Sequence, residues 1–95
     1  MSNSLEQAQR DKLEIICRKL RLKPQEKFLD IGSGWGGLIC YAAKNYGVKS
    51  HGVTLSEKQY RYTLEKIKRL GLEGQVTVEL RDYMTVEGLY DKISS

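Results

Sequence analysis

Apolar positions recur with a helical period near the start of the chain. They lie three or four residues apart, which places them on one face of a helix. They are Leu13, Ile16, Cys17 and Leu20. The pattern predicts a leading helix over residues 4–20, and Pro24 closes the segment because the residue before a proline leaves helical geometry.

Short apolar runs then alternate with two more helical patterns. We expect strands over residues 27–31, 49–55, 76–81 and 89–95. The first intervening helix is expected over residues 37–46, with Gly47 as its left-handed C-terminal cap. Residues 82–88 are predicted to form a loop or a single helical turn.

The second intervening helix carries a start signal. Ser56 and Gln59 fit a capping box, in which Ser56 is the N-cap and Gln59 reaches back to it. Tyr60, Leu64 and Ile67 follow at helical spacing and form the apolar stripe that we expect to be buried.

The alternation of strands and helices indicates parallel strands joined by right-handed crossovers. We expect an α/β fold, a three-layer doubly wound Rossmann-like sheet with strand order 3-2-1-4, truncated after the fourth strand. Residues 1–95 then form one partial domain. In such sheets ligands bind beyond the carboxyl ends of the strands where the strand order reverses. That point lies between strands one and four, beside residues 32–36.

A glycine-dense turn follows the first strand. Residues 32–37 hold four glycines in six positions, directly after Asp30. Glycine is needed where the backbone takes a positive φ or where a ligand approaches bare main chain. A tight strand-to-helix turn needs one or two glycines, so four of them favour a nucleotide-type cofactor at this turn.

Two cofactor classes fit the glycines. Gly32, Gly34 and Gly37 satisfy G-x-G-x-x-G, but a dinucleotide site also wants an acid about 20 residues on, at the end of the second strand. Residues 53–56 contain none. Asp30 with Gly32, Gly34 and Gly36 satisfies D-x-G-x-G-x-G instead. An acid there repels a pyrophosphate but suits the ammonium and sulfonium of S-adenosylmethionine, which we favour.

Composition limits the remaining function classes. The 95 residues are 40% apolar and 29% charged with net charge +4, which suits a soluble, cytoplasmic domain with a mild bias toward anionic surfaces. The sequence contains no basic cluster flanked by aromatic residues, so we expect no nucleic-acid partner. Cys17 and Cys40 are expected to be free buried thiols, and His51, the single histidine, to be structural. We predict no metal site.

Four segments together resemble one enzyme family: residues 29–38, 52–59, 82–83 and 90–93. The family is that of the cyclopropane-fatty-acyl-phospholipid synthases and mycolic acid cyclopropane synthases, which are S-adenosylmethionine-dependent methyltransferases. Trp35 in the glycine turn and the Thr-Leu-Ser-x-x-Gln run distinguish it from other methyltransferases. Ser33 departs from the family, which usually has cysteine there.

The resemblance implies a role for each matching residue. Asp30 would hold the cofactor's ammonium group through water, and the glycine turn would line its methionine part. The turn residues concerned are Gly32, Ser33, Gly34 and Gly36. Ribose and adenine would lie against Thr54, Leu55 and Gln59, with Asp82, Tyr83 and Met84 bordering the adenine. Trp35 is expected to pack under the loop rather than to touch the cofactor.

The resemblance also implies an activity, the transfer of a methyl or methylene unit to a double bond of a lipid acyl chain. This chain would carry the S-adenosylmethionine-binding half only, so no catalytic residue is assigned. The implied partners are S-adenosylmethionine and S-adenosylhomocysteine and, for the full-length protein, a lipid or anionic membrane surface. The unpaired edge of the fourth strand separately predicts self-association. Another small-molecule methyltransferase and a non-catalytic dinucleotide-binding module remain alternatives.

Overall fold

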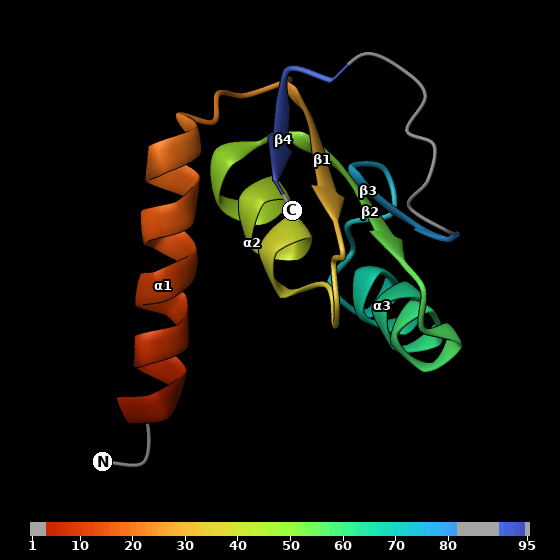
Figure 1. The fold of residues 1–95 in the computed structure, drawn as a ribbon. Coiled ribbons are helices and arrows are strands. Elements are labelled where there is room, and N and C mark those ends of the chain that lie inside the picture. The colour runs from red at the N-terminus through yellow and green to blue at the C-terminus, as the bar shows by residue number, and fades with distance from the viewer. Residues whose placement is uncertain (1–3, 82–89, 95) are drawn as a thin grey trace.

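Four parallel strands form one sheet in the computed structural model of the chain, which describes residues 4–81 and 90–94 (Figure 1). The elements follow in the order α1 (Ser4–Leu20), β1 (Lys27–Ile31), α2 (Gly37–Tyr46), β2 (Lys49–Thr54), α3 (Glu57–Arg69), β3 (Val76–Leu80) and β4 (Lys92–Ser94). The strand order is β3-β2-β1-β4. The predicted α/β fold and strand order are confirmed.

Three strands are shorter than predicted, and β3 ends at Leu80 rather than at residue 81. β2 ends at Thr54, and Leu55 after it is 59% exposed. β4 begins at Lys92, because Asp91 is used to cap the start of β1. The main-chain N–H of Lys27 donates to the Asp91 carboxylate, and the Asp91 N–H donates to the Lys27 carbonyl, both at 2.8 Å.

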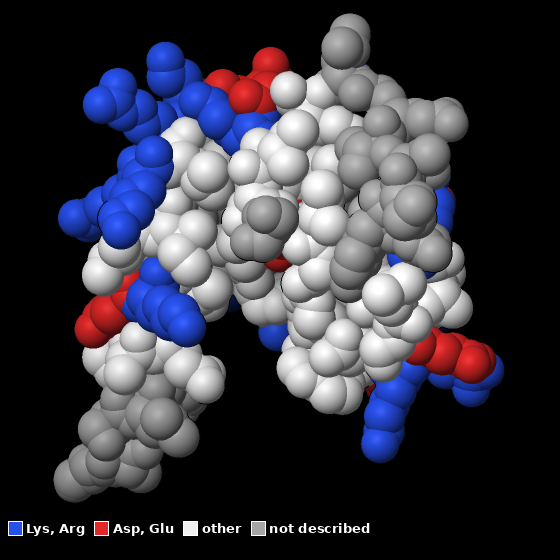
Figure 2. All heavy atoms as spheres, in the orientation of Figure 1, with Lys and Arg blue, Asp and Glu red and all other residues white. Residues whose placement is uncertain are grey.

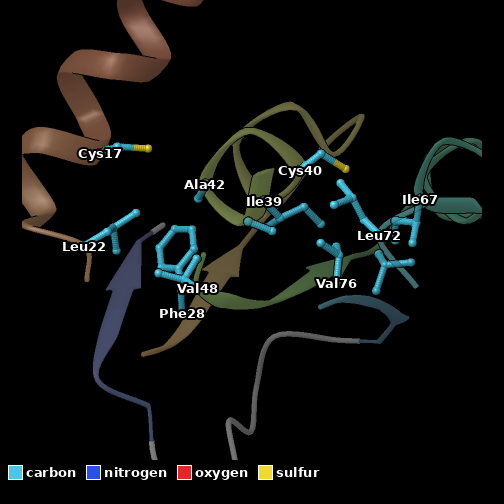
Figure 3. Packing of buried hydrophobic residues seen from close by; sticks show 12 residues of the cluster. Cys17, Leu22, Phe28, Ile39, Cys40, Ala42, Val48, Ile67, Leu72 and Val76 are labelled. Carbon is cyan, nitrogen blue, oxygen red and sulfur yellow. The ribbon is translucent and has the colours of Figure 1, made fainter. Parts of the chain in front are cut away.

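The main hydrophobic cluster lies on one face of the sheet, where the three described helices pack. Side chains alternate between the two faces along a strand, and Phe28, Val76 and Val78 share a face. There they meet Ile39 of α2 and Ile67 of α3 (Figure 3). The cluster is completed by Cys17, Leu22, Cys40, Ala42, Ala43, Val48 and Leu72. The carboxyl ends of the strands are left beside the glycine turn.

Both cysteines are buried and free, as the sequence predicts. Burial raises the pKa of Cys17 to about 11 and also raises the pKa of Cys40. Each thiol therefore serves as a small apolar side chain of the core.

α3 buries only part of the predicted stripe: Ile67 is buried and Tyr60 packs against the core, but Leu64 does neither. Its buried residues are Thr63 and Ile67, whereas Leu64 is 44% exposed. Residues four apart share a helix face, so Thr63 and Ile67 point together toward the sheet and the glycine turn. The predicted burial of Leu64 is wrong, because the packing of α3 selects the row that contains a threonine.

One carboxylate holds α1 against α2. Glu14 accepts hydrogen bonds from the hydroxyls of Tyr41 and Tyr46 on α2 and from Arg18 on α1. These bonds, that from Tyr41 most of all, lower the pKa of Glu14 from 4.5 to about 2. The contact between the two helices therefore depends on the charge of Glu14.

We predict that Glu14→Gln lowers the midpoint of thermal unfolding, since an amide is a weaker acceptor for the two hydroxyls and loses the charge beside Arg18. The lowered pKa of Glu14 stabilises the fold above pH 4.5, and this stabilisation is lost as the pH falls toward 2. The gap between wild type and E14Q should therefore close over that interval in melts followed by circular dichroism.

Glu57→Gln is the matched control for E14Q. Glu57 also pairs with an arginine one turn away, but both side chains are more than half exposed and lie on one helix. Surface pairs of this kind contribute little to stability, so E57Q should melt like wild type. A gap for E14Q that stays constant from neutral pH down to about 2 would contradict the role of Glu14.

Candidate cofactor site

The glycine turn is fixed to the end of β2 by main-chain hydrogen bonds. The N–H groups of Gly32 and Ser33 both donate to the Val53 carbonyl, at 2.8 and 2.9 Å. The N–H of Gly36 donates to the Ser33 carbonyl at 3.0 Å and closes the turn. The turn is therefore anchored at the carboxyl ends of the adjacent strands β1 and β2.

The backbone φ angles distinguish between the two glycine motifs. Gly32, Gly34 and Gly36 adopt left-handed φ angles of 77°, 58° and 81°, which L side chains rarely adopt. Gly37 has no such angle, and a Cβ there would meet nothing within 4 Å. In a dinucleotide site the third glycine allows close helix–strand packing. The geometry therefore requires the glycines of D-x-G-x-G-x-G and not the last one of G-x-G-x-x-G.

Gly34 leaves open space above the turn. A Cβ on Gly34 would meet nothing within 4 Å, although the residue before it is buried. Ser33 is 7% exposed, and its hydroxyl has no hydrogen-bond partner among the described residues. The turn thus presents bare main chain to a space that no described side chain fills.

Gly52 is needed by the protein itself. A Cβ there would lie 2.7 Å from the Cβ and Oγ of Ser33 and 2.8 Å from the Cδ1 of Ile39. The sequence leaves open whether a ligand or a neighbouring helix approaches this glycine. The structure places the glycine turn and α2 against it.

Asp30 is a buried carboxylate that has no counter-charge among the described residues. It is 7% exposed at the end of β1, between Gly52 on β2 and Ser94 on β4. Burial alone raises the pKa of Asp30 from 3.8 to about 6, with no hydrogen bond or cation opposing it in the part of the chain that is described. A group held in this state favours a ligand that brings a positive charge.

A second polar group ends β2. Thr54 is 1% exposed, and its hydroxyl donates to the Gln59 carboxamide oxygen at 3.1 Å. The N–H of Ser56 donates to the Thr54 hydroxyl at 3.2 Å, and the Gln59 N–H donates to the Ser56 hydroxyl at 3.2 Å. Ser56 is thus the N-cap of α3, as predicted. The other half of the capping box is wrong, because Thr54 takes the place of the Ser56 N–H as the partner of Gln59.

Most of the predicted cofactor residues therefore meet at one edge of the sheet. Asp30 lies near the end of β1, directly before the glycine turn. Thr54 ends the adjacent β2, and Leu55 and Gln59 follow it. The predicted adenine residues Asp82, Tyr83 and Met84 lie outside the described residues.

Trp35 does not pack under the loop, so that prediction is wrong. Its side chain is 49% exposed, and its ring meets Tyr62 of α3 edge to face, with centroids 5.2 Å apart and planes at 85°. Sequence reasoning also missed Thr63, which is fully buried beside Gly36. The sequence did contain a sign of this, because Thr63 lies four residues from both Gln59 and Ile67 and so shares their helix face, which points toward the turn.

His51 lies away from this edge. Its Nδ1 is 2.6 Å from the Thr77 hydroxyl and its Nε2 is 3.1 Å from the Glu79 carboxylate, so the ring joins β2 to β3. It lines a hollow of about 360 Å3 with Lys27 and Tyr90, near the amino ends of the strands. This arrangement supports the predicted structural role.

The fold is that of the S-adenosylmethionine-dependent methyltransferases. The chain superposes with a TM-score of 0.88 on the mycolic acid cyclopropane synthase CmaA1, solved with S-adenosylhomocysteine and CTAB, over 95% of this chain and 32% of that one, at 29% identity. The model of the mycolic acid cyclopropane synthetase family matches residues 1–95, and the chain belongs to this family.

Curated relatives agree with the family. The chain is 45% identical over 94 residues to the cyclopropane-fatty-acyl-phospholipid synthase of Escherichia coli K12, covering 99% of this chain and 24% of that protein. It is 42% identical over 95 residues to a probable fatty acid methyltransferase of Pseudomonas putida, covering 98% and 24%. The chain thus spans about a quarter of the length of these relatives.

We predict that Asp30→Asn stabilises the free protein at about pH 8 by up to about 3 kcal/mol, because a shift of the pKa from 3.8 to about 6 costs that much once the group is ionised. The raised pKa of Asp30 leaves the stability of the wild type unaffected below pH 3.8. Stability then falls as the pH rises from 3.8, and the loss is complete above about pH 6. Urea unfolding of both proteins at about pH 4 and 8 measures the difference.

The exposed Glu65, changed to Gln, is the control for loss of one negative charge. E65Q should unfold like wild type at both pH values. A D30N protein that is less stable than wild type at about pH 8 would show that the carboxylate has a stabilising partner and would contradict the description of Asp30.

Proposed function

We propose that this chain is the S-adenosylmethionine-binding part of an enzyme that adds a one-carbon unit to a double bond in a lipid acyl chain. The observation that carries the proposal is the buried Asp30, which has no charged partner among the described residues and lies beside a turn of bare main chain. Such a site suits a cofactor whose amino-acid part is cationic and whose body must lie close to the backbone.

The residues present fit this cofactor. Asp30 would take its ammonium group, and Gly32, Ser33, Gly34 and Gly36 would line the methionine part. The N-cap of α2 is Gly36, which makes no side-chain cap, and the first turn of α2 contains no acid. The positive end of this helix is therefore open to the cofactor's carboxylate. When bound, the cofactor would supply an activated methyl group.

The nucleoside would lie over the end of β2. Thr54 and Gln59 already form one hydrogen-bonded unit there, and Leu55 offers a 59% exposed apolar side chain. We assign ribose and adenine to these three residues. The roles of Asp82, Tyr83 and Met84 beside the adenine stay predictions.

The acceptor class is proposed from the relatives. The proteins that this chain matches are named as a fatty acid methyltransferase and a cyclopropane-fatty-acyl-phospholipid synthase. Because the chain covers about a quarter of each, activity on acyl chains is proposed for the whole enzyme. We assign no residue of this chain to the chemical step.

An anionic lipid surface is the proposed partner of the whole enzyme. The net charge is +4, and Figure 2 shows Lys and Arg gathered on the side of α1. No described helix combines the length and apolarity of a membrane span. Self-association through β4 also stays a prediction; Ile93 on that strand is 53% exposed.

Calorimetric titration of the chain with S-adenosylhomocysteine and, separately, with NAD tests the proposed cofactor. We expect Gly34→Ala to weaken binding of S-adenosylhomocysteine by about tenfold or more, because the new Cβ enters the ligand space. Heat with NAD alone would overturn the proposal in favour of a dinucleotide-binding module.

Gly71→Ala is the matched control for G34A. Gly71 also has a left-handed φ, of 69°, and a Cβ there would also meet nothing within 4 Å. Both substitutions therefore cost the same backbone strain, about 1–2 kcal/mol. Only G34A should lose affinity, and equal losses in the two variants would trace the effect to stability rather than to the site.

The affinity should also depend on pH through Asp30. Because the free carboxyl has a pKa of about 6, it must lose a proton before it can hold an ammonium group. We predict that the affinity for S-adenosylhomocysteine is constant above about pH 7 and falls about tenfold per pH unit below 6. D30N should bind weakly at every pH, and an unchanged slope in D30N would exclude Asp30 as its source.

A further inference from the structure

We propose that α3 is a clamp on the glycine turn and that Thr63 is a positioning residue for the cofactor. The inference rests on the proposed function, because the turn is taken as the cofactor's seat. Two successive residues of α3, Tyr62 and Thr63, hold three successive residues of the turn, 34–36. Figure 1 shows α3 beside the turn that follows β1.

The inner contact is steric. Thr63 is fully buried, and a Cβ built on Gly36 would lie 2.7 Å from its Cγ2 and 3.1 Å from its Oγ1. The Thr63 hydroxyl also faces the Gly34 carbonyl, but at 3.5 Å, which is long for an O–H···O bond. The methyl group of Thr63 therefore supports the turn more than its hydroxyl does.

The outer contact is aromatic. Trp35 and Tyr62 meet edge to face with centroids 5.2 Å apart, while both side chains stay partly exposed. Such a pair restricts the ring of Trp35 and, with it, the backbone between Gly34 and Gly36. The turn is thus held from inside and outside by one helix.

The clamp joins the two parts of the site. Gln59, Tyr62 and Thr63 lie at positions i, i+3 and i+4 and share a helix face. Gln59 is bonded to Thr54 at the end of β2, while Thr63 supports the turn after β1. α3 therefore fixes the distance between the seat of the nucleoside and the seat of the amino-acid part. A substitution that loosens the clamp should lower the affinity for the cofactor before it unfolds the protein.

The rival explanation is ordinary core packing, in which Thr63 contributes to stability alone. Val76→Ala provides the comparison, since Val76 is a buried residue of similar volume in the core and belongs to β3. Thr63→Val keeps the shape of Thr63 and removes only the long hydrogen bond. Thr63→Ala removes the methyl group as well.

Trp35 gives a readout of the turn that a purely structural role would not change. It is the single tryptophan, so its emission and its quenching by acrylamide report the turn alone. We expect T63A to bind S-adenosylhomocysteine about fivefold more weakly, the size of one lost methyl contact, and to show greater quenching of Trp35. T63V should match wild type within about twofold in affinity and in quenching.

V76A should lower the unfolding midpoint at least as much as T63A while leaving affinity and quenching unchanged. Tyr62→Leu tests the outer contact in a variant whose core is intact, since Tyr62 is 43% exposed. Y62L should also increase the quenching of Trp35 and weaken binding.

Wild-type affinity in T63A and Y62L, or equal losses in T63A and V76A, would overturn the clamp. A failure of the wild type to bind S-adenosylhomocysteine would instead overturn the proposed cofactor. Quenching of Trp35 in the free proteins would still decide whether α3 holds the turn.

Discussion

Two hydrogen bonds to one carbonyl fix the arrangement at this end of the sheet. The N–H groups of Gly32 and Ser33 both turn back to Val53, so the chain leaves β1 and immediately binds to β2. This is possible because Gly52 carries no side chain, which lets Ser33 lie against the neighbouring strand. The position of α2, the opening above Gly34 and the surroundings of Asp30 all follow from this short link.

The Asp30 carboxylate at this end of the sheet is an unfavourable buried charge that the fold tolerates. Asp30 lies in β1 and is surrounded by buried chain, with nothing among the described residues to offset its charge. Proteins retain such groups where a ligand completes the site. The core on the helical face, from Phe28 to Ile67, supplies the stability that offsets the cost. Under the proposed function, stability and cofactor binding therefore make opposite demands on Asp30.

Sequence periodicity predicted most of the elements, because each depends on a pattern local to its own segment, and the alternation of strands and helices then gave the strand order. What it missed depends on contacts between segments. Thr63 was overlooked because Leu64 is the more apolar neighbour, yet the packing of α3 against Gly36 turns Leu64 to solvent. The partner of Gln59 could not be predicted either, since Thr54 and Ser56 compete for it only once β2 meets α3.

The burial of the two sulfur atoms has a practical side. Cys17 is fully enclosed and Cys40 is 3% exposed, and each holds its proton well above neutral pH. Alkylating reagents attack the thiolate, so the folded chain offers them almost no target. A single cysteine introduced at an exposed position would then be the one site for a fluorophore or spin label, without removal of the native pair.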